Sequence, residues 1–524
     1  MTIEIAFHGA AGSVTGSCME LTIGGRHILI DCGMFQGSRT LEGLNHEPLP
    51  FDPADLDAVI LTHAHLDHSG RLPLLQRKGL AAPLWCTPAT AQLIEPLLLD
   101  AAKLQEADVQ RRNRRPDRIG MKPFTRLYDA NDVKRLAKRA RPLAFDIWEE
   151  ILPGVKIRFR DARHILGAAS VEMLADGQRL LFSGDIGNAA AEAHFHDGAD
   201  AVPFDHLVCE STYGDRDRVT PSVDERRETL AKIVETALAR GGNLLIPAFA
   251  LERTQVVLED LVALFDSGRL SKSPVFVDSP LAERVTHAYR RFRGGSAGTF
   301  DDPFVTFTQS IQQSRALNGQ SGSIILAGSG MCNGGRIRHH LLLNLPRADS
   351  TVLFVGYQVS GTLGAVLQSG APTVRISGSD LEVCAHIETI DAYSAHADHA
   401  GLLRWLRAVS PVSGSVFLDH GEQPALDRLA DDATGLAGHG RPLIPILGER
   451  YALDAGVAAR KIAGPRPNAR ALLEPEDWRN RYAAIASSLA ERLRALPSDE
   501  AREAALRAVE RTLDANRASV AAAA

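Results

Sequence analysis

The segment LTHAHLDHSG, which begins at Leu61, constrains this chain more than any other part of its sequence. It follows the apolar run AVI and places three histidines and one aspartate within six positions. Imidazole and carboxylate groups are the ligands that borderline divalent metals prefer, and polar rings at a buried strand end are costly when unpaired. Four ligands from one loop cannot all bind one tetrahedral ion that keeps an open position. The pattern therefore predicts two ions, the first pair of ligands binding one ion and the second pair the other: His63, His65, Asp67 and His68.

Two hairpin signatures place further polar residues near the same edge. SCMELTI and RHILIDCG flank a Gly-Gly turn and leave Asp31 at a strand end. ASVEMLA and RLLFSGD flank an Asp-Gly turn, so His164 and Asp185 should emerge near one sheet end. A carboxylate at Asp185 can bridge two ions, and Asp31 can accept the second N–H of a metal-bound imidazole. His420, in FLDHGE after another strand-like run, is the best remaining ligand for the second ion.

Length and composition limit the class of protein. A chain of 524 residues exceeds the size of one usual hydrophobic core, so two domains with accessory structure are expected. The net charge of -6 excludes a uniformly basic nucleic-acid coat, and a polyanion would have to bind a local patch. The cysteines are scattered without CxxC spacing, which favours reduced thiols in a cytosol. Without a secretory leader or an apolar stretch of about 18 residues, we expect a cytoplasmic protein with no membrane partner.

Four regions follow from the pattern of strands and helices. Short β-branched runs separated by turn signals fill residues 1–210. Strand-like and helical stretches alternate over residues 211–390, which predicts a parallel sheet covered by helices. A His- and Asp-rich pattern returns in residues 391–463, so the middle region is interpreted as an insertion into one metal-binding domain. The expected fold class is therefore α/β, with a helical extension over residues 464–524.

The extension is expected to be a helical hairpin. Ser498, followed by acidic residues, predicts the capped start of its second helix. Apolar side chains recur at helical spacing before that point: Trp478, Tyr482, Ile485, Leu489, Leu493 and Leu496. This stripe is interpreted as packing, with a homodimer contact as the alternative.

The motifs also carry a family resemblance. HAHLDH together with His164, Asp185 and His420 resembles the metallo-β-lactamase superfamily, which implies an αββα sandwich with a two-metal site at one edge. CESTYGD with Glu210, DAYSAHAD with His396, and FLDHGE resemble the three additional motifs of the β-CASP nucleases. PAFALERTQVV, VFVDSPLA and SGMCNGGRIRHHL resemble landmarks of the inserted β-CASP domain. The likeness extends from the first residue to about residue 455.

The resemblance implies a full set of metal ligands. Carried over by position, the first zinc would be bound by His63, His65 and His164. The second would be bound by Asp67, His68 and His420, with Asp185 shared between the ions. Manganese is an alternative to zinc. RNA-acting members of the family carry histidine at the position of His420, whereas members that repair DNA carry valine there. The resemblance therefore points to RNA.

Hydrolysis of a phosphodiester bond is the chemistry that matches such a site. A zinc pair lowers the pKa of a shared water toward neutrality and clamps a phosphate for in-line attack. His396 is the predicted general acid for the leaving 3′ oxygen, and Glu210 is predicted to fix its tautomer and raise its pKa. Asp67 is predicted to be a catalytic residue together with His396 and Glu210. The expected enzyme is a zinc-dependent endoribonuclease acting on single-stranded RNA and leaving 5′-phosphate and 3′-hydroxyl ends.

Three other functions stay open at this point. A hydrolase of small esters or thioesters shares the HAHLDH motif, although a small substrate does not need an inserted domain with Glu210 and His396. A non-catalytic scaffold in RNA processing is a second alternative, although scaffold members of the family lose ligands that this chain keeps. A 5′ exoribonuclease is the third, because the motifs around the metals do not separate it from an endonuclease.

Two further segments are weaker candidates for binding RNA. Residues 103–141 hold 13 Lys and Arg against 5 Asp and Glu, which fits either a backbone-binding patch or a solvated helix face. The glycine-rich segment AGSGMCNGGR, residues 327–336, fits either a phosphate cradle on backbone N–H groups or tight packing.

Overall fold

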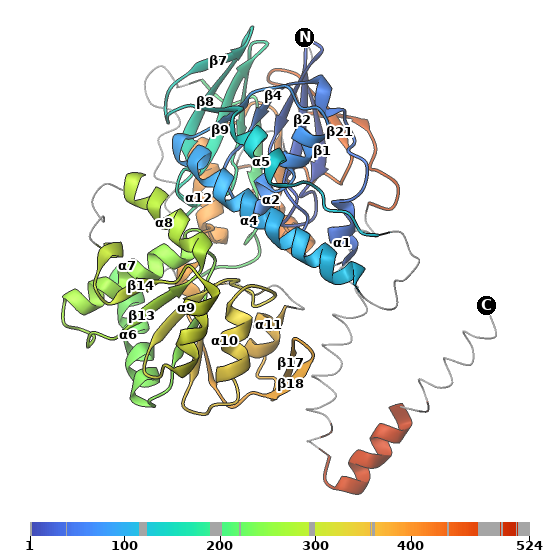
Figure 1. Ribbon diagram of the computed structural model, residues 1–524. Coiled ribbons are helices and arrows are strands. Elements are labelled where there is room, and N and C mark those ends of the chain that lie inside the picture. Colours follow the sequence, from blue (N-terminus) through green and yellow to red (C-terminus); the bar gives the residue numbers. More distant parts are fainter. Residues whose placement is uncertain are drawn as a thin grey trace.

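The computed structural model contains two sheets that pack face to face and a third sheet that lies apart from them (Figure 1). It describes the following residues: 3–37, 39–114, 123–188, 202–218, 222–292, 299–356, 358, 362–436, 440–469, 493, 496–509 and 511.

The first sheet has eight strands and contains both ends of the metal-binding region. Its spatial order is β22 (Arg460–Ala463), β21 (Arg450–Leu453), β1 (Ile3–Gly9), β2 (Cys18–Ile23), β3 (Arg26–Ile30), β4 (Leu56–Ile60), β5 (Leu84–Cys86) and β6 (Ala140–Pro142). The predicted Gly-Gly hairpin is confirmed: Ile23 pairs with Arg26, and both turn glycines, Gly24 and Gly25, have positive φ. Asp31 follows β3 directly, as the pattern predicted.

The second sheet has six strands and brings distant segments together. Its order is β20 (Val416–Asp419), β11 (His206–Glu210), β10 (Gln178–Phe182), β9 (Ala169–Ala175), β8 (Val155–Asp161) and β7 (Glu149–Leu152). The predicted Asp-Gly hairpin joins β9 to β10, with Asp176 at φ 48° and Gly177 at φ 75°. Strand β20 pairs in parallel with β11, and Glu210 lies opposite Asp419. The chain segment before His420 therefore lies beside the one that ends at Glu210.

The two sheets bury an apolar core between them and carry helices on their outer faces. Phe7 of the first sheet contacts Phe417 of the second, with ring centroids 5.4 Å apart. One outer face is covered by helices of the first part of the chain: α2 (Leu66–Ser69), α3 (Leu72–Arg77), α4 (Pro88–Asn113) and α5 (Ala130–Ala137). The other is covered by α12 (His399–Val409) and α13 (Gln423–Asp432). The expected αββα sandwich is confirmed. Helix α1 (Arg39–Leu44) and the 3₁₀ turn η1 (Pro53–Asp55) lie in the β3–β4 connection.

The insertion forms a parallel sheet of its own, as the alternating pattern predicted. Its order is β14 (Val305–Phe307), β13 (Val275–Asp278), β15 (Ile324–Ala327), β12 (Leu244–Pro247), β16 (Thr351–Phe354) and β19 (His386–Thr389). Its helices are α6 (Val223–Ala239), α7 (Arg253–Asp266), α8 (Pro280–Phe292), α9 (Ile311–Ala316), α10 (Ile337–Asn344) and α11 (Leu363–Gln368). Smaller elements complete it: η5 (Thr299–Asp301), η6 (Leu317–Gly319), β17 (Thr373–Ile376) and β18 (Ser379–Glu382). In Figure 1 this green and yellow part lies below the sandwich, and orange α12 returns upward from it.

Part of the C-terminal extension can be compared with its prediction. Residues 499–509 form a helix, and the Ala501 N–H donates to Ser498 Oγ at 3.2 Å, so the capped start is confirmed. Most of the apolar stripe falls outside the described residues: Trp478, Tyr482, Ile485 and Leu489. All six cysteines are free. In the described part of the chain, every helix is too short or too polar to cross a membrane.

Candidate metal centre

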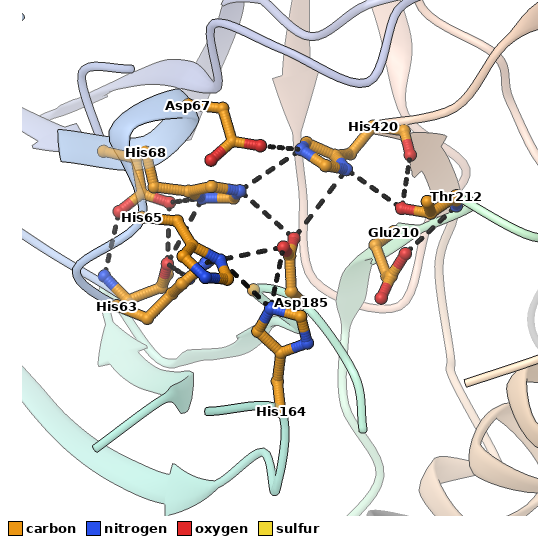
Figure 2. A network of polar contacts seen from close by, with 12 residues as sticks. His63, His65, Asp67, His68, His164, Asp185, Glu210, Thr212 and His420 are labelled. Atoms are coloured by element: carbon orange, nitrogen blue, oxygen red, sulfur yellow. Dashed lines mark hydrogen bonds and ion pairs between the residues drawn. The ribbon is translucent and has the colours of Figure 1, made fainter. Parts of the chain in front are cut away.

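The HAHLDH loop changes its backbone conformation halfway, and this divides its ligands. After β4 the chain runs through a bent loop, and His63 and His65 lie two positions apart on it before α2 begins. His65 is then the N-cap of α2, and Asp67 and His68 lie on that short helix. Ser69 Oγ closes the turn by donating to the carbonyl oxygens of Ala64 at 3.0 Å and His65 at 2.9 Å. In Figure 2 the side chains of this loop face Asp185, and Asp67 lies toward His420.

Three imidazoles converge on one side of Asp185. His65 Nδ1 lies 3.2 Å from both His63 Nε2 and His164 Nε2. Asp185 Oδ2 lies 3.4 Å from His63 Nε2 and 3.5 Å from His164 Nε2. Two nitrogens bound at zinc distances to one tetrahedral ion lie about 3.3 Å apart. These four groups therefore have the spacing of one metal coordination shell.

A second group lies on the other side of Asp185. His68 Nε2 is 3.2 Å from His420 Nε2 and 3.1 Å from Asp185 Oδ1. Asp67 Oδ2 completes the group at 3.8 Å from His420 Nε2. His420 has φ 50°, a left-handed conformation that is costly for a residue with a side chain and is found at functional sites. His420 follows the end of β20 in this conformation, and Figure 2 shows its ring pointing toward Asp185.

Asp185 gives an independent test of whether metal ions fit. Its side chain is buried, and neither oxygen accepts a well-formed hydrogen bond from the described residues; the groups that face it are imidazole nitrogens, His68 Nε2 at 3.1 Å and His63 Nε2 at 3.4 Å. A buried carboxylate without donors is costly unless a cation compensates it. Burial lowers the pKa of His65 to about 3 and also lowers that of His63, so both rings keep a free lone pair for a metal. The donor set fits divalent cations on both sides of Asp185.

Asp31 lies behind the second group and holds its ring in place. Its Oδ2 atom is 2.7 Å from His68 Nδ1 and accepts from Thr62 Oγ1 at 2.8 Å, while Oδ1 accepts from the Thr62 N–H at 2.8 Å. His68 therefore donates from Nδ1 and directs Nε2 toward Asp185. This is the contact that the sequence predicted for Asp31, and such contacts orient metal-binding imidazoles.

His396 reaches the edge of the cluster from a distant part of the chain. Its Nδ1 atom lies 3.1 Å from Glu210 Oε1, and its Nε2 atom lies 3.9 Å from Asp185 Oδ2. Ala397 N–H donates to the carbonyl oxygen of Ile186 at 2.7 Å and fixes this approach. Burial lowers the pKa of His396, but the charge and hydrogen bond of Glu210 outweigh it and raise the pKa above its ordinary value.

Three residues near the cluster were missed by the sequence analysis. Thr212 Oγ1 lies 3.2 Å from His420 Nδ1. The Tyr213 ring meets the His396 ring edge to face at 5.9 Å between centroids. The Arg218 guanidinium lies over Tyr213 at 4.3 Å and donates to the backbone carbonyl of His396. Thr212 and Tyr213 belong to the quoted CESTYGD motif, but the sequence does not indicate that they contact His420 and His396.

The two weaker candidate segments are better explained by local structure. On α4, Arg112 pairs with Asp108 at 2.5 Å, and Arg126 pairs with Glu106 at 3.2 Å. In the glycine-rich segment, backbone groups bond to one another, and a Cβ at Gly335 would lie 2.2 Å from the Gly328 oxygen. The described part of the 103–141 segment therefore resembles a solvated helix face, and the glycines permit close backbone packing.

The αββα sandwich and its two-sided cluster define the protein as a metal-dependent hydrolase with a divalent metal site. More particularly, the chain belongs to the metallo-β-lactamase superfamily, in the group that carries a β-CASP domain. Three family models match it: metallo-β-lactamase superfamily over residues 11–223, β-CASP domain over 254–367, and Zn-dependent metallo-hydrolase RNA specificity domain over 380–455.

Relatives match most of the chain. It is 39% identical to Ribonuclease TTHA0252 of Thermus thermophilus over 81% of this chain and 94% of that protein. It is 31% identical to the Transcription termination factor FttA of Cenarchaeum symbiosum over 82% of this chain and 67% of that protein. It is 27% identical to the RNase J-like protein of Methanocaldococcus jannaschii over 80% of this chain and 93% of that protein. A crystal structure of a protein of unknown function from Enterococcus faecalis V583 has the same fold, with a TM-score of 0.52 and 14% sequence identity. The match covers 86% of this chain and 100% of that chain.

Proposed function

We propose that the protein is a two-zinc endoribonuclease that hydrolyses single-stranded RNA and leaves 5′-phosphate and 3′-hydroxyl ends. The observation that carries the proposal is the position of Asp185 between two ligand groups, with the His396–Glu210 pair at the edge of the same cluster. A general acid beside two cation sites suits cleavage of a phosphodiester. Manganese could replace zinc in the same ligand set, and the cytoplasm is the proposed location.

The ligands divide as the two groups suggest. His63, His65 and His164 would hold the first ion, and Asp67, His68 and His420 the second, with Asp185 shared. When bound, the two ions would activate the attacking water and neutralise charge on the phosphate. Asp31 would keep His68 oriented for the second ion. Asp67 serves the reaction as a ligand.

His396 would supply the proton for the leaving group. Cleavage breaks the bond between phosphorus and the 3′ oxygen, and that oxygen needs a proton to leave as a hydroxyl. With Nδ1 held by Glu210, His396 would donate from Nε2, the atom that faces the cluster. Glu210 is a positioning residue: its Oε1 also accepts from the Ile186 N–H at 2.7 Å, and Oε2 accepts from the Thr212 N–H at 3.0 Å.

Two observations support RNA as the substrate: the names of the relatives, and the family model that matches the region around His396 and His420. Ribonuclease TTHA0252 and the RNase J-like protein are named for action on RNA. The RNA specificity domain model covers both His396 and His420. The proposed domain limits are 1–210, 211–390, 391–463 and 464–524, so these residues would belong to the part of the sandwich that follows the insertion.

A labelled RNA oligonucleotide tests the proposal. Internal cuts in a 5′-blocked, internally labelled RNA are expected, and end-labelling of the products should find 5′ phosphates. Complete resistance of the blocked RNA, with cleavage of a free 5′ end, would support a 5′ exonuclease instead. Turnover of a thioester without any RNA cleavage would contradict a nuclease of either kind.

Metal analysis separates the enzyme from a scaffold. About two zinc or manganese ions per chain are expected after gentle purification, as in other two-metal sites. Chelation should abolish RNA cleavage, and adding back either metal should restore it. Less than one ion per chain, with no cleavage after metal is added, would favour a non-catalytic role.

A further inference from the structure

The turn between β12 and α7 carries two side chains that the proposed reaction does not use. Strand β12 ends at Pro247 and α7 begins at Arg253, so this turn lies at the carboxyl end of an inner strand of the parallel sheet. Open parallel sheets bind ligands beyond the carboxyl ends of their strands. The turn is held firmly, since the Phe249 carbonyl accepts from the Thr254 N–H at 3.2 Å and from Thr254 Oγ1 at 2.8 Å.

Arg253 is a half-buried cation that forms no ion pair among the described residues. Its Nε atom is buried, and among the described residues its guanidinium has no hydrogen bond or ion pair. Nearby arginines of the insertion do not share this feature: Arg226 pairs with Asp260 at 2.7 Å, and Arg227 pairs with Asp260 at 2.9 Å. A guanidinium removed from water without an acceptor is costly, so its environment favours an anion that arrives with a ligand.

Groups that contact His396 also act electrostatically on this guanidinium. Burial lowers the pKa of Arg253 to about 10, the neighbouring charges of Glu252 and Tyr213 raise it, and the charge of Arg218 lowers it. Arg218 and Tyr213 are the residues that surround His396. On its other side, the Nε atom lies 3.7 Å from the position that a Cβ on Gly356, just after β16, would occupy. Arg253 thus belongs to the inserted domain, and residues that contact His396 lie within electrostatic reach of it.

Phe249 supplies an exposed aromatic ring on the same turn. Its side chain is 40% exposed, although it is large and apolar. The ring packs on Gly330, where a Cβ would lie 2.8 Å from two ring atoms, so only glycine leaves room for it. An aromatic ring supported from behind and open to solvent can stack with a nucleic-acid base of any identity.

We propose that the β12–α7 turn binds the nucleotide next to the scissile bond, with Arg253 holding its phosphate and Phe249 stacking on its base. This subsite rests on the proposed ribonuclease function and assigns part of the RNA contact to the inserted domain. It recognises a flanking nucleotide by charge and stacking, so it selects single-stranded RNA without selecting a base sequence.

Replacing one charge on each partner tests the phosphate contact. The assay uses a series of RNA oligonucleotides, each with one neutral methylphosphonate at a different position. KM for cleavage of each oligonucleotide is measured with wild type and with Arg253→Met. In wild type, one position beside the cleavage site should raise KM about ten- to hundred-fold, as expected for a lost charge-assisted hydrogen bond. In Arg253→Met, KM should already be raised and that position should have no further effect. Arg253→Lys should restore part of the loss.

Matched controls keep this outcome interpretable. Arg375 is 70% exposed on β17, so Arg375→Met should behave as wild type. The salt dependence of RNA binding should lose about 0.7 from its logarithmic slope in Arg253→Met, the value for one phosphate of a single strand. Equal KM values and slopes for wild type and Arg253→Met would overturn the subsite.

A fluorescent base tests the stacking contact. RNA carrying 2-aminopurine at the position next to the cleavage site should lose fluorescence on binding to wild type and to Phe249→Tyr. Phe249→Leu should not quench it, whereas Phe292→Leu, at another exposed phenylalanine, should. Quenching by Phe249→Leu equal to wild type would overturn the stacking role. If wild type cleaved no RNA at all, the proposed function itself would fail, which is a different result from RNA cleavage that these variants leave unchanged.

Discussion

His396 Nδ1 lies 3.1 Å from Glu210 Oε1, although the two residues are 186 positions apart in the chain. The contact forms where the segment after the insertion pairs with the loop that holds Asp185: Gly187 and His396 form an isolated antiparallel bridge. It leaves Nε2 of His396 facing the metal cluster, the arrangement that a general acid at this site requires.

Removing the His396 ring should abolish most turnover and spare the metals. We expect His396→Ala to lower kcat on RNA by about 10²- to 10⁴-fold, the usual contribution of general acid catalysis. Metal content measured by elemental analysis should equal that of wild type, since the proposed ligands are unchanged. His386, exposed on β19, gives the matched control, and His386→Ala should keep full activity. An unchanged kcat in His396→Ala would contradict the acid role.

Removing the charge of Glu210 should shift the pH dependence of the reaction. Glu210 raises the pKa of His396, so wild-type His396 keeps its proton to higher pH and loses it as pH rises through that raised pKa. In Glu210→Gln the pKa of His396 should fall, and the decline of kcat on the alkaline side should begin at lower pH. Profiles of kcat against pH for both proteins test this. Superimposable alkaline limbs would show that His396 is not the titrating acid.

Removing the acceptor behind His68 should weaken metal binding. Asp31 accepts from the His68 ring, and replacing the partner of a metal-bound imidazole typically costs 10- to 100-fold in metal affinity or activity. Asp31→Ala should therefore release one ion at lower chelator concentration than wild type, as measured by competition with a zinc dye. Asp57→Ala, on β4 and outside the cluster, serves as a control. Equal chelator midpoints for Asp31→Ala and wild type would refute the orienting role.

A buried carboxylate in the insertion should stabilise the fold in a pH-dependent way. Burial raises the pKa of Asp278, but contacts with His340 at 2.7 Å, Ser314 at 2.6 Å and Arg336 at 2.6 Å outweigh it, so its pKa is lowered. A carboxyl whose pKa is lower in the folded state stabilises the protein above its unfolded pKa of about 3.9. That contribution is lost as the pH falls toward the folded value.

Asp278→Asn should therefore lower the free energy of unfolding by about 3 to 5 kcal/mol at neutral pH, the usual cost of breaking a buried ion pair. The gap to wild type should narrow below about pH 4. Denaturant titrations at several pH values measure both quantities. Asp380, which is 72% exposed, gives the control variant Asp380→Asn, which should match wild type throughout. A gap that stays constant down to acid pH would refute this linkage.

Local sequence determined several parts of this protein. A Gly-Gly and an Asp-Gly turn fix the two hairpins, because each requires positive φ and sets the strand register beside it. The alternation of strands and helices fixes the parallel sheet of the insertion. Histidines and an aspartate in six positions after an apolar strand indicate a metal site, because few other environments accept so many polar rings.

Only the tertiary structure decided how distant groups meet. His68 and His420 are 352 positions apart, and their 3.2 Å contact depends on how the two sheets pack. The same packing surrounds the buried Asp185 carboxylate with imidazole nitrogens and leaves Arg253 without an ion pair among the described residues. Sequence spacing carries no such information, because an unpaired buried charge is defined by what surrounds it in space. The sequence therefore determined which side chains can bind a metal, and the fold decided which of them lie close enough to share one.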